Sequence, residues 1–207
     1  MRVLVVKTSS LGDLIHTFPA VTDAARALPD IEFHWLSESG FAEVPTWHPA
    51  VSRVITIDWR RWRGKLYKNW TNGKLKQFRQ ALQADQYDLV IDAQGLLKSA
   101  IPARLARGEV AGFDRGSARE PAASFLYQYR YPVARQQHAI ARVRQLFSAA
   151  LGYPLPETDP EYGIRIETGS LQAERPYLIF LHATTWLSKH WPESYWAELC
   201  YLAVKAG

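Results

Sequence analysis

Several side chains able to do chemistry follow the first apolar run of the chain. Residues 3–7 read VLVVK, and Ser9, Ser10, Gly12 and Asp13 come directly after them. A carboxylate just beyond a strand can reach a hydroxyl group in a cleft and remove its proton, so Asp13 is a candidate general base. Asp13 can instead cap the helix that begins there, a role worth about 0.3–1 kcal/mol. Because that carboxylate would repel a phosphate, we expect no nucleotide at this loop.

A second polar loop follows a later apolar run. YLIFLH at 177–182 precedes Thr184, Thr185 and Lys189, which together offer two hydroxyl groups and a cation to a phosphate. A solvated surface lysine explains Lys189 equally well. Neither loop has the glycine spacing of a dinucleotide fingerprint or of a P-loop.

Asp92 and Gln94 follow the apolar residues 87–93 in the same way. The Gln94 amide is suited to binding a sugar, although a role in the turn and helix cap fits as well. The six histidines show no metal-ligand spacing and Cys200 is the single cysteine, so we expect no zinc site and no internal disulfide.

The excess of basic residues is concentrated in one segment of the chain. The 207 residues carry a net charge of +5, and 47% of them are hydrophobic, as in an ordinary globular protein. Between Trp59 and Ala84 there are eight basic residues and no acidic one; they are Arg60, Arg61, Arg63, Lys65, Lys68, Lys74, Lys76 and Arg79. Such a cluster attracts polyanions, or is simply a solvated surface.

We find neither a secretory signal nor a membrane-spanning run and expect a cytoplasmic protein.

Strand-like and helix-like segments alternate along the chain, which predicts an α/β fold with a mostly parallel, Rossmann-like sheet and helices on both faces. The expected strands are 3–7, 31–36, 53–57, 87–93, 109–113 and 177–182, and the expected helices are 12–28, 73–84, 96–107, 119–129, 138–151 and a last one after Pro192. Ligands bind at the carboxyl ends of such strands, where the candidate residues lie.

Proline and glycine separate two unequal parts. We predict an N-terminal domain over 1–155, a linker over 156–176, and over 177–207 the first strand and helix of a second Rossmann-like domain. Since one strand and one helix cannot bury a core, we expect most of that second domain to be missing from the chain.

The motifs together resemble a known family. The motifs that carry the resemblance are KTSSLGDLIHTFPA (7–20), DAQGLLKSA (92–100), SAREP (117–121), QHAIARVRQLF (137–147) with LGY (151–153), and FLHATTWLSKHWPE (180–193). They are similar to the heptosyltransferases of the lipopolysaccharide inner core (heptosyltransferase I type, glycosyltransferase family 9), which are inverting enzymes of the two-domain GT-B fold. The resemblance implies transfer of heptose from ADP-heptose to the Kdo of Kdo2-lipid A at the cytoplasmic face of the inner membrane. It implies no metal cofactor, no nucleic acid and no obligate protein partner.

The resemblance also assigns roles to residues. It implies that Asp13 is the catalytic base, that Lys189 contacts the donor phosphates, and that Thr184 and Thr185 lie in the donor loop. The implied acceptor-binding residues are Ser10, Gly12, Arg60, Arg61, Arg63, Gln94 and Arg119.

One element of the family is missing. The Asp-Thr-Gly that grips the donor sugar does not occur in the chain, so we expect little activity from this polypeptide alone. Two alternatives stay open: a heptosyltransferase acting later in the core, and a non-catalytic domain that binds polyanions.

Overall fold

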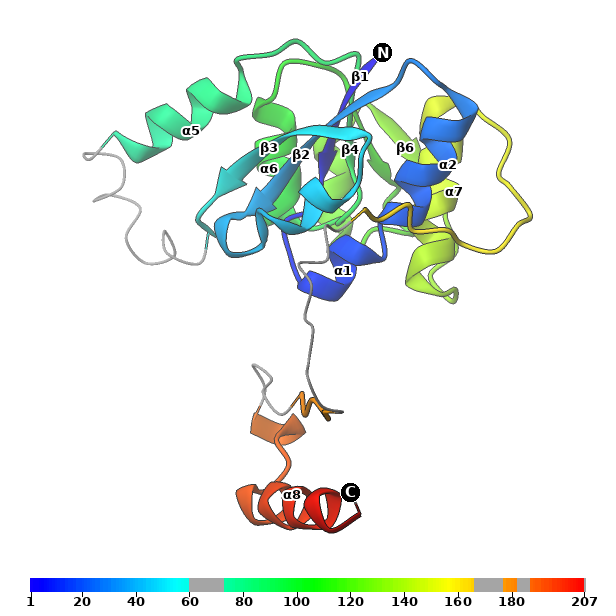
Figure 1. Ribbon diagram of the computed structural model, residues 1–207. Helices are drawn as coiled ribbons and strands as arrows, with labels where there is room; N and C mark the ends of the chain where they lie inside the picture. The colour runs from blue at the N-terminus through cyan, green and yellow to red at the C-terminus, as the bar shows by residue number, and fades with distance from the viewer. Residues whose placement is uncertain (60–72, 166–176, 182–186, 207) are drawn as a thin grey trace. The chain divides into compact units, whose positions relative to one another are not determined.

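The chain forms two compact units, Met1–Ile166 and Glu167–Gly207. The structure, a computed structural model, describes residues 1–59, 73–165, 177–181 and 187–206 (Figure 1). In the larger unit, β-branched runs form strands and helices cover them on two sides, as the sequence predicts.

Six parallel strands form one sheet in the order β3-β2-β1-β4-β5-β6. The strands are β1 (Arg2–Val6), β2 (Glu32–Glu38), β3 (Val51–Ile57), β4 (Leu89–Asp92), β5 (Val110–Phe113) and β6 (Tyr129–Tyr131). β1 lies between β2 and β4, with Val5 opposite Trp35 on one side and Ile91 on the other. The strand order reverses direction at β1, which is where ligands bind in open sheets of this class. The predicted fold class is confirmed.

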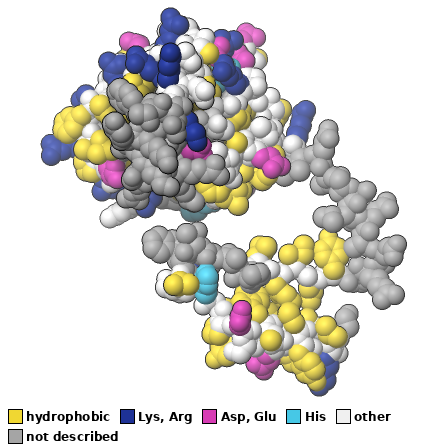
Figure 2. Space-filling model, turned by 90° about the vertical axis from the view of Figure 1, so that its left-hand side faces the viewer, with side chains coloured by type: hydrophobic (Ala, Val, Ile, Leu, Met, Phe, Trp, Pro, Cys, Tyr) yellow, Lys and Arg dark blue, Asp and Glu magenta, His cyan; other side chains and the backbone are white. Residues whose placement is uncertain are grey.

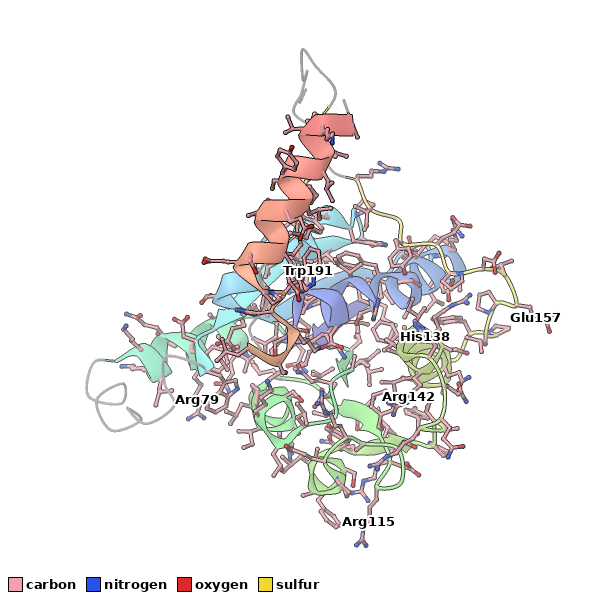
Figure 3. All side chains as sticks on the ribbon, turned by 90° about the horizontal axis from the view of Figure 1, so that it is seen from below. Arg79, Arg115, His138, Arg142, Glu157 and Trp191 are labelled. Carbon is pink, nitrogen blue, oxygen red and sulfur yellow. The ribbon has the colours of Figure 1, made fainter. Side chains whose placement is uncertain are left out.

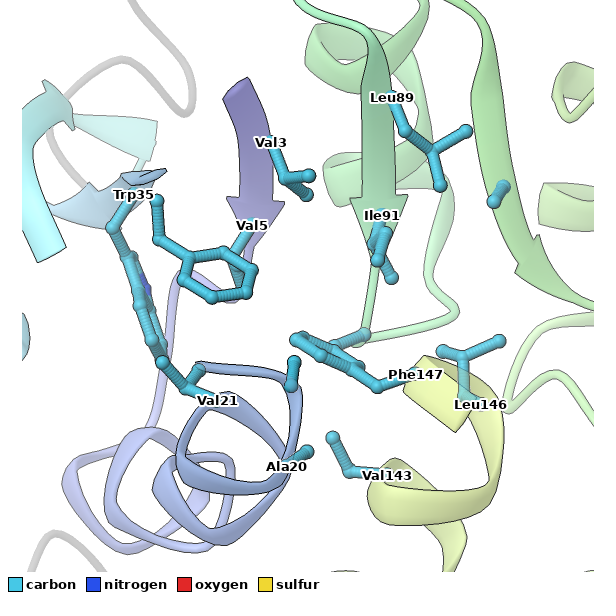
Figure 4. Close-up of a cluster of buried hydrophobic side chains, with 14 of the residues drawn as sticks. Val3, Val5, Ala20, Val21, Trp35, Leu89, Ile91, Val143, Leu146 and Phe147 are labelled. Carbon is cyan, nitrogen blue, oxygen red and sulfur yellow. The ribbon is translucent and has the colours of Figure 1, made fainter. Parts of the chain in front are cut away.

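Alternate residues of each strand point to opposite faces, and each face carries its own core. On one face α2 (Phe18–Ala27) and α7 (Ala139–Leu151) pack against Val3, Val5 and Ile91 (Figure 4). On the other face α5 (Lys74–Leu82), α6 (Leu97–Leu105) and the 3-10 segment η3 (Pro121–Leu126) cover a second cluster. Two further 3-10 turns, η1 (Ser39–Phe41) and η2 (Val44–Trp47), connect β2 to β3.

The single helix expected over 12–28 is in fact two, α1 (Leu11–Ile15) and α2. Pro19 lies in the first turn of α2 and has no N–H to continue a helix from α1. The Thr17 hydroxyl donates to the Asp13 carbonyl at 2.9 Å, which satisfies an acceptor at the break. The break leaves α1 as a short separate helix that carries Asp13.

The helix expected over 119–129 is not formed; the chain makes η3 and then strand β6. Tyr127 is the reason, because its ring packs so closely on Gly112 that a Cβ there would lie 2.5 Å from it. The buried Tyr127 hydroxyl also donates to Asp92 Oδ2 at 2.7 Å. These contacts direct the following residues into pairing with β5 instead of a helix.

Residues 153–165 pack on the larger unit. Arg144 forms a buried ion pair with Asp23, 2.6 Å from Nε to Oδ2, and donates to the carbonyls of Pro156 and Thr158. The Arg165 amide donates to the Trp47 carbonyl at 2.8 Å. The first residues of the predicted linker 156–176 are therefore held by the domain, and residues 166–176 lie outside the described ranges.

The smaller unit contains η4 (Leu187–Lys189) and α8 (Glu193–Ala206) among its described residues. Residues 177–181, where a strand was expected, have no regular secondary structure. A strand needs a neighbour to satisfy its backbone groups, and none of the described residues supplies one. No described helix in either unit is both long enough and apolar enough to span a membrane.

His48 makes the stability of the larger unit depend on pH. Burial lowers the pKa of its imidazole to about 4, and its Nδ1 accepts from the Ala50 amide. An unfolded histidine titrates near pH 6.5, so the stabilisation is complete above that pH and is lost as the pH falls toward 4. We expect His48→Gln to remove about 2 kcal/mol of the stability loss between pH 7 and pH 5, measured by urea unfolding. His138→Gln, which changes an exposed ring, should keep the wild-type loss; equal losses in all three proteins would contradict this.

Candidate active site

A cavity of about 330 Å³ opens at the carboxyl ends of β1, β4 and β5. Figure 3 looks onto this edge of the sheet. The lining residues are Lys7, Asp13, Ala93, Gln94, Phe113, Ser117, Arg119, Arg135, Ala139, Arg142 and Val143. Three residues proposed from the sequence, Asp13, Gln94 and Arg119, thus line one pocket although they are up to 106 positions apart.

Asp13 combines the two roles considered from the sequence. Its Oδ2 accepts from the Ser10 amide at 2.9 Å and from the Ser10 hydroxyl at 3.1 Å, which closes a capping box at the start of α1. Among the described residues none donates to Oδ1, so that oxygen is available to a ligand hydroxyl. A Cβ at Gly12 would have no described atom within 4 Å, and this keeps the surface beside Asp13 open.

Gln94 joins the loops that follow β1 and β4. Its Oε1 accepts from the Thr8 amide at 2.8 Å and the Thr8 hydroxyl at 2.9 Å, and its Nε2 donates to the Ser9 carbonyl at 2.9 Å. The amide is therefore largely occupied within the protein. It lines the pocket, and its strongest physical role there is to position the β1 loop.

Asp92 in turn holds the Gln94 loop. The buried carboxylate accepts from the amides of Gln94 and Gly95 at 2.9 and 3.2 Å. Gly95 has φ +69, and a Cβ there would lie 3.3 Å from the Arg119 backbone nitrogen. This close approach, with the Glu120 amide donating to the Gly95 carbonyl, brings Arg119 to the pocket.

Three further cations line the pocket beside Arg119. Lys7 is 8% exposed and donates from Nζ to the Ala93 carbonyl at 2.9 Å. The pKa of the Lys7 ammonium is lowered, because the effect of burial exceeds the opposing effect of the nearby Asp13 and Asp92 carboxylates. Arg135 donates to the Ala118 carbonyl. Among the described residues that line it, the pocket has four cations and one carboxylate, that of Asp13, and it is therefore cationic.

Arg142 keeps unused hydrogen-bonding capacity. Its guanidinium lies over the Phe113 ring, 4.9 Å from the centroid, and Nη2 donates to the Ser117 carbonyl at 2.7 Å. Its Nε is buried, and no residue in the described part of the chain accepts a hydrogen bond from it. Burial lowers the pKa of this guanidinium, and the charge of Arg135 lowers it further. An anionic ligand in the pocket would relieve this electrostatic cost.

Sequence reasoning missed Lys7, Ser117, Arg135 and Arg142 as pocket residues. One signal was present for Arg142, since a cation in the first turn of a helix opposes the helix dipole. A lysine directly at the end of a buried strand, as at Lys7, is a comparable signal. Nothing local in the sequence indicates Ser117 or Arg135.

Other predicted site residues are not placed in this pocket. Arg60, Arg61, Arg63, Thr184 and Thr185 lie outside the described residues. Lys189 ends η4 in the smaller unit, where it is exposed. No group of three His, Cys, Asp or Glu side chains arranged for a metal ion occurs within the described ranges.

Comparison with known proteins identifies the family. The sequence profile of "Glycosyltransferase family 9 (heptosyltransferase)" matches residues 75–207, more than half of the chain. The chain belongs to this family. It is 59% identical to lipopolysaccharide heptosyltransferase 1 of Pseudomonas aeruginosa, over 100% of this chain and 59% of that protein. It is 50% identical to lipopolysaccharide heptosyltransferase 1 of Escherichia coli K12, over 100% of this chain and 66% of that protein.

Solved structures agree with this family assignment. The E. coli heptosyltransferase WaaC with ADP matches with a TM-score of 0.93 and 50% identity, over 100% of this chain and 66% of that one. E. coli ADP-heptose LPS heptosyltransferase II matches with a TM-score of 0.73 at 18% identity, a likeness of fold alone. The family 9 chain therefore spans about three fifths to two thirds of the length of these relatives.

The Gln94 side chain should contribute measurably to stability. Gln94→Ala leaves the buried Thr8 amide without a partner, so we expect the free energy of unfolding to fall by about 1–3 kcal/mol. Gln145→Ala is the matched control, because among the described residues the Gln145 side chain bonds Gln137 alone, in an exposed pair. Urea unfolding should show a change within about 0.5 kcal/mol for this control. Equal effects of the two substitutions on the free energy of unfolding would show that the Gln94 hydrogen bonds do not stabilise the loop after β1.

Proposed function

We propose that this chain is the acceptor-binding part of a heptosyltransferase that moves heptose from ADP-heptose to the Kdo of Kdo2-lipid A. The observation that carries the proposal is the Asp13 carboxylate in a cavity lined by four cations. A glycosyl acceptor needs a base beside its hydroxyl, and an acidic glycolipid needs cations around it. Membership of family 9 and the names of the relatives support the same assignment.

Asp13 acts as the general base in this proposal. Its Oδ1 takes the proton of the acceptor hydroxyl while the hydroxyl oxygen bonds the anomeric carbon of heptose. The bond from that carbon to the ADP oxygen breaks on the opposite face, so the configuration is inverted. The Ser10 amide and hydroxyl hold Oδ2, which leaves Oδ1 as the oxygen available to the acceptor hydroxyl.

The cations bind the acidic groups of the acceptor. Arg119 is exposed, and no described residue accepts a hydrogen bond from the buried Nε of Arg142. Guanidinium groups bind carboxylates through paired hydrogen bonds, which suits the carboxylate of a Kdo sugar. We propose that Ser10, which bonds Asp13, and the neighbouring Gly12 also contact the acceptor. Arg60, Arg61 and Arg63 are proposed acceptor-binding cations on the sequence evidence alone.

Donor binding is assigned to the smaller unit. Lys189 offsets the charge that develops on the departing ADP, and Thr184 and Thr185 contact the donor. We propose that this lysine serves where other transferases use a metal ion, so added EDTA should leave turnover unchanged. The enzyme would act as a peripheral protein on the cytoplasmic face of the inner membrane, without nucleic acid or an obligate protein partner.

Removing the base should abolish most turnover. In a protein of the relatives' full length, we expect Asp13→Asn to lower kcat about 10²–10⁴-fold and to leave the dissociation constant for ADP-heptose unchanged. Asp159→Asn, which changes an exposed carboxylate, is the control and should keep wild-type turnover. Turnover of Asp13→Asn equal to that control would exclude Asp13 as the base.

The acceptor cations should show their effect in KM for the acceptor. Arg142→Met removes a charge-assisted donor, so we expect KM for Kdo2-lipid A to rise about 10–100-fold while KM for the donor stays constant. Arg115→Gln removes an exposed cation that Figure 3 places away from Arg142 and should leave both constants unchanged. A rise in KM for the donor alone would contradict the assignment.

The second candidate is a heptosyltransferase that acts later in the core. Its acceptor would already carry heptose, so one transfer assay offering both acceptors distinguishes the two. The 59% and 50% identities to proteins named heptosyltransferase 1, against 18% to heptosyltransferase II, favour the Kdo acceptor.

A further inference from the structure

Helix α6 has hydrophobic residues on both sides. Its buried side consists of small or compact residues, which are Ser99, Ala100, Pro102 and Ala103. Its larger aliphatic side chains face solvent: Leu97 is 40% exposed, Ile101 45% and Leu105 41%. A surface helix ordinarily turns such side chains inward and polar ones outward. The reversed arrangement indicates that the outer side of α6 has a partner.

Phe125 adds an exposed aromatic side chain on an element that contacts α6. It belongs to η3, which packs against α6, and its side chain is 66% exposed. We call Leu97, Ile101, Leu105 and Phe125 the α6 face. Leu97, Ile101 and Leu105 are spaced four residues apart and therefore lie along one side of the helix. Contiguous exposed apolar side chains mark interaction sites more often than scattered ones do.

The charges around the α6 face are mostly positive. The remaining exposed residues of α6 are Lys98 and Arg104, and the helix has no acidic residue. Neighbouring α5 adds Arg79, which donates to Gln83 Oε1 at 3.3 Å, and the Gln83 side chain donates to the Leu105 carbonyl at 2.8 Å. The Glu120 carboxylate accepts from the Leu97 amide at 2.7 Å, so it is engaged by the start of the helix. Hydrophobic and basic side chains lie together at the left edge of the larger unit in Figure 2.

The α6 face begins beside the candidate active site. Leu97 follows the pocket residue Gln94 by three positions, and Lys98 Nζ lies 3.1 Å from Ser9 Oγ in the β1 loop. A partner that covers the start of the α6 face would therefore lie near the loops after β1 and β4, beside pocket residues Lys7 and Gln94.

We propose that the α6 face docks on the surface of an anionic lipid bilayer. Aliphatic and aromatic side chains enter the boundary between headgroups and acyl chains, while flanking cations attract acidic headgroups. Two copies of this face would bring Lys98 and Arg104 against one another without carboxylates, which disfavours self-association. The choice of a lipid partner rests on the proposed function, because that site would receive a membrane-held acceptor.

Vesicle binding tests the proposal directly. A protein of the relatives' full length should co-sediment with vesicles of phosphatidylcholine and phosphatidylglycerol, and less with phosphatidylcholine alone. Replacing Leu97, Ile101 and Leu105 together by serine should weaken this binding about tenfold or more, and Arg104→Gln should weaken it about fivefold. The matched controls are Leu155→Ser, at an exposed leucine (42%) far along the chain, and Arg115→Gln, and both should bind like wild type.

A fluorescent probe covers the case in which the triple variant fails to fold. A polarity-sensitive dye on Ile101→Cys, in a background with Cys200→Ser, should shift to the blue when the anionic vesicles are added. No shift, a dye already shielded before vesicles are added, wild-type vesicle binding by the folded triple variant, or a change of oligomeric state in that variant would each overturn the proposal.

An activity assay separates this proposal from the proposed function. The triple variant should keep wild-type transfer to a detergent-dispersed acceptor and lose transfer to the same acceptor in vesicles. Wild-type protein that binds vesicles yet transfers no heptose to either form would refute the function and leave the docking surface standing. Equal transfer by the variant to both forms would refute the docking surface alone.

Discussion

The arrangement of the larger unit depends on one buried carboxylate. Asp92 ends β4 next to the central strand and accepts four hydrogen bonds, from the amides of Gln94 and Gly95 and the hydroxyls of Ser99 and Tyr127. The pKa of this carboxyl is raised, because the effect of burial exceeds the opposing effect of the four hydrogen-bond donors. The donors come from the β4 loop, from α6 and from the chain before β6. A single acceptor therefore sets the positions of three segments that are separate in sequence.

The candidate site has more positive than negative side chains among its described lining residues. Among the described lining residues Asp13 is the one carboxylate, and Ser10 holds it at the start of α1. The buried Lys7 and the half-buried Arg142 donate to backbone carbonyls, and no described carboxylate bonds either of them. Their charges are therefore incompletely compensated within the domain. Such a pocket favours an anionic ligand and leaves the base free to act on it.

Helix α6 connects the site to the outer surface of the unit. Ser99 near its start bonds Asp92, and Lys98 reaches the β1 loop, so the inner side of the helix is fixed by the site. Its compact buried residues allow close packing on the sheet, which leaves Leu97 and Ile101 on the outside. The packing that places the Gln94 loop thus also creates the exposed apolar face.

The sequence alone determined the parallel sheet and the placement of Asp13 and Gln94 at the same edge of it. Strand runs and helical periodicity are local, and parallel strands bring the residues that follow them to one edge. Tertiary structure decided what local patterns do not encode. Tyr127 bonds Asp92 across 35 positions, and the chain after it becomes a strand where its pattern predicted a helix. Arg142 reaches the pocket because α7 packs on the sheet with its first turn at that edge; the apolar spacing of α7 specifies only its buried side.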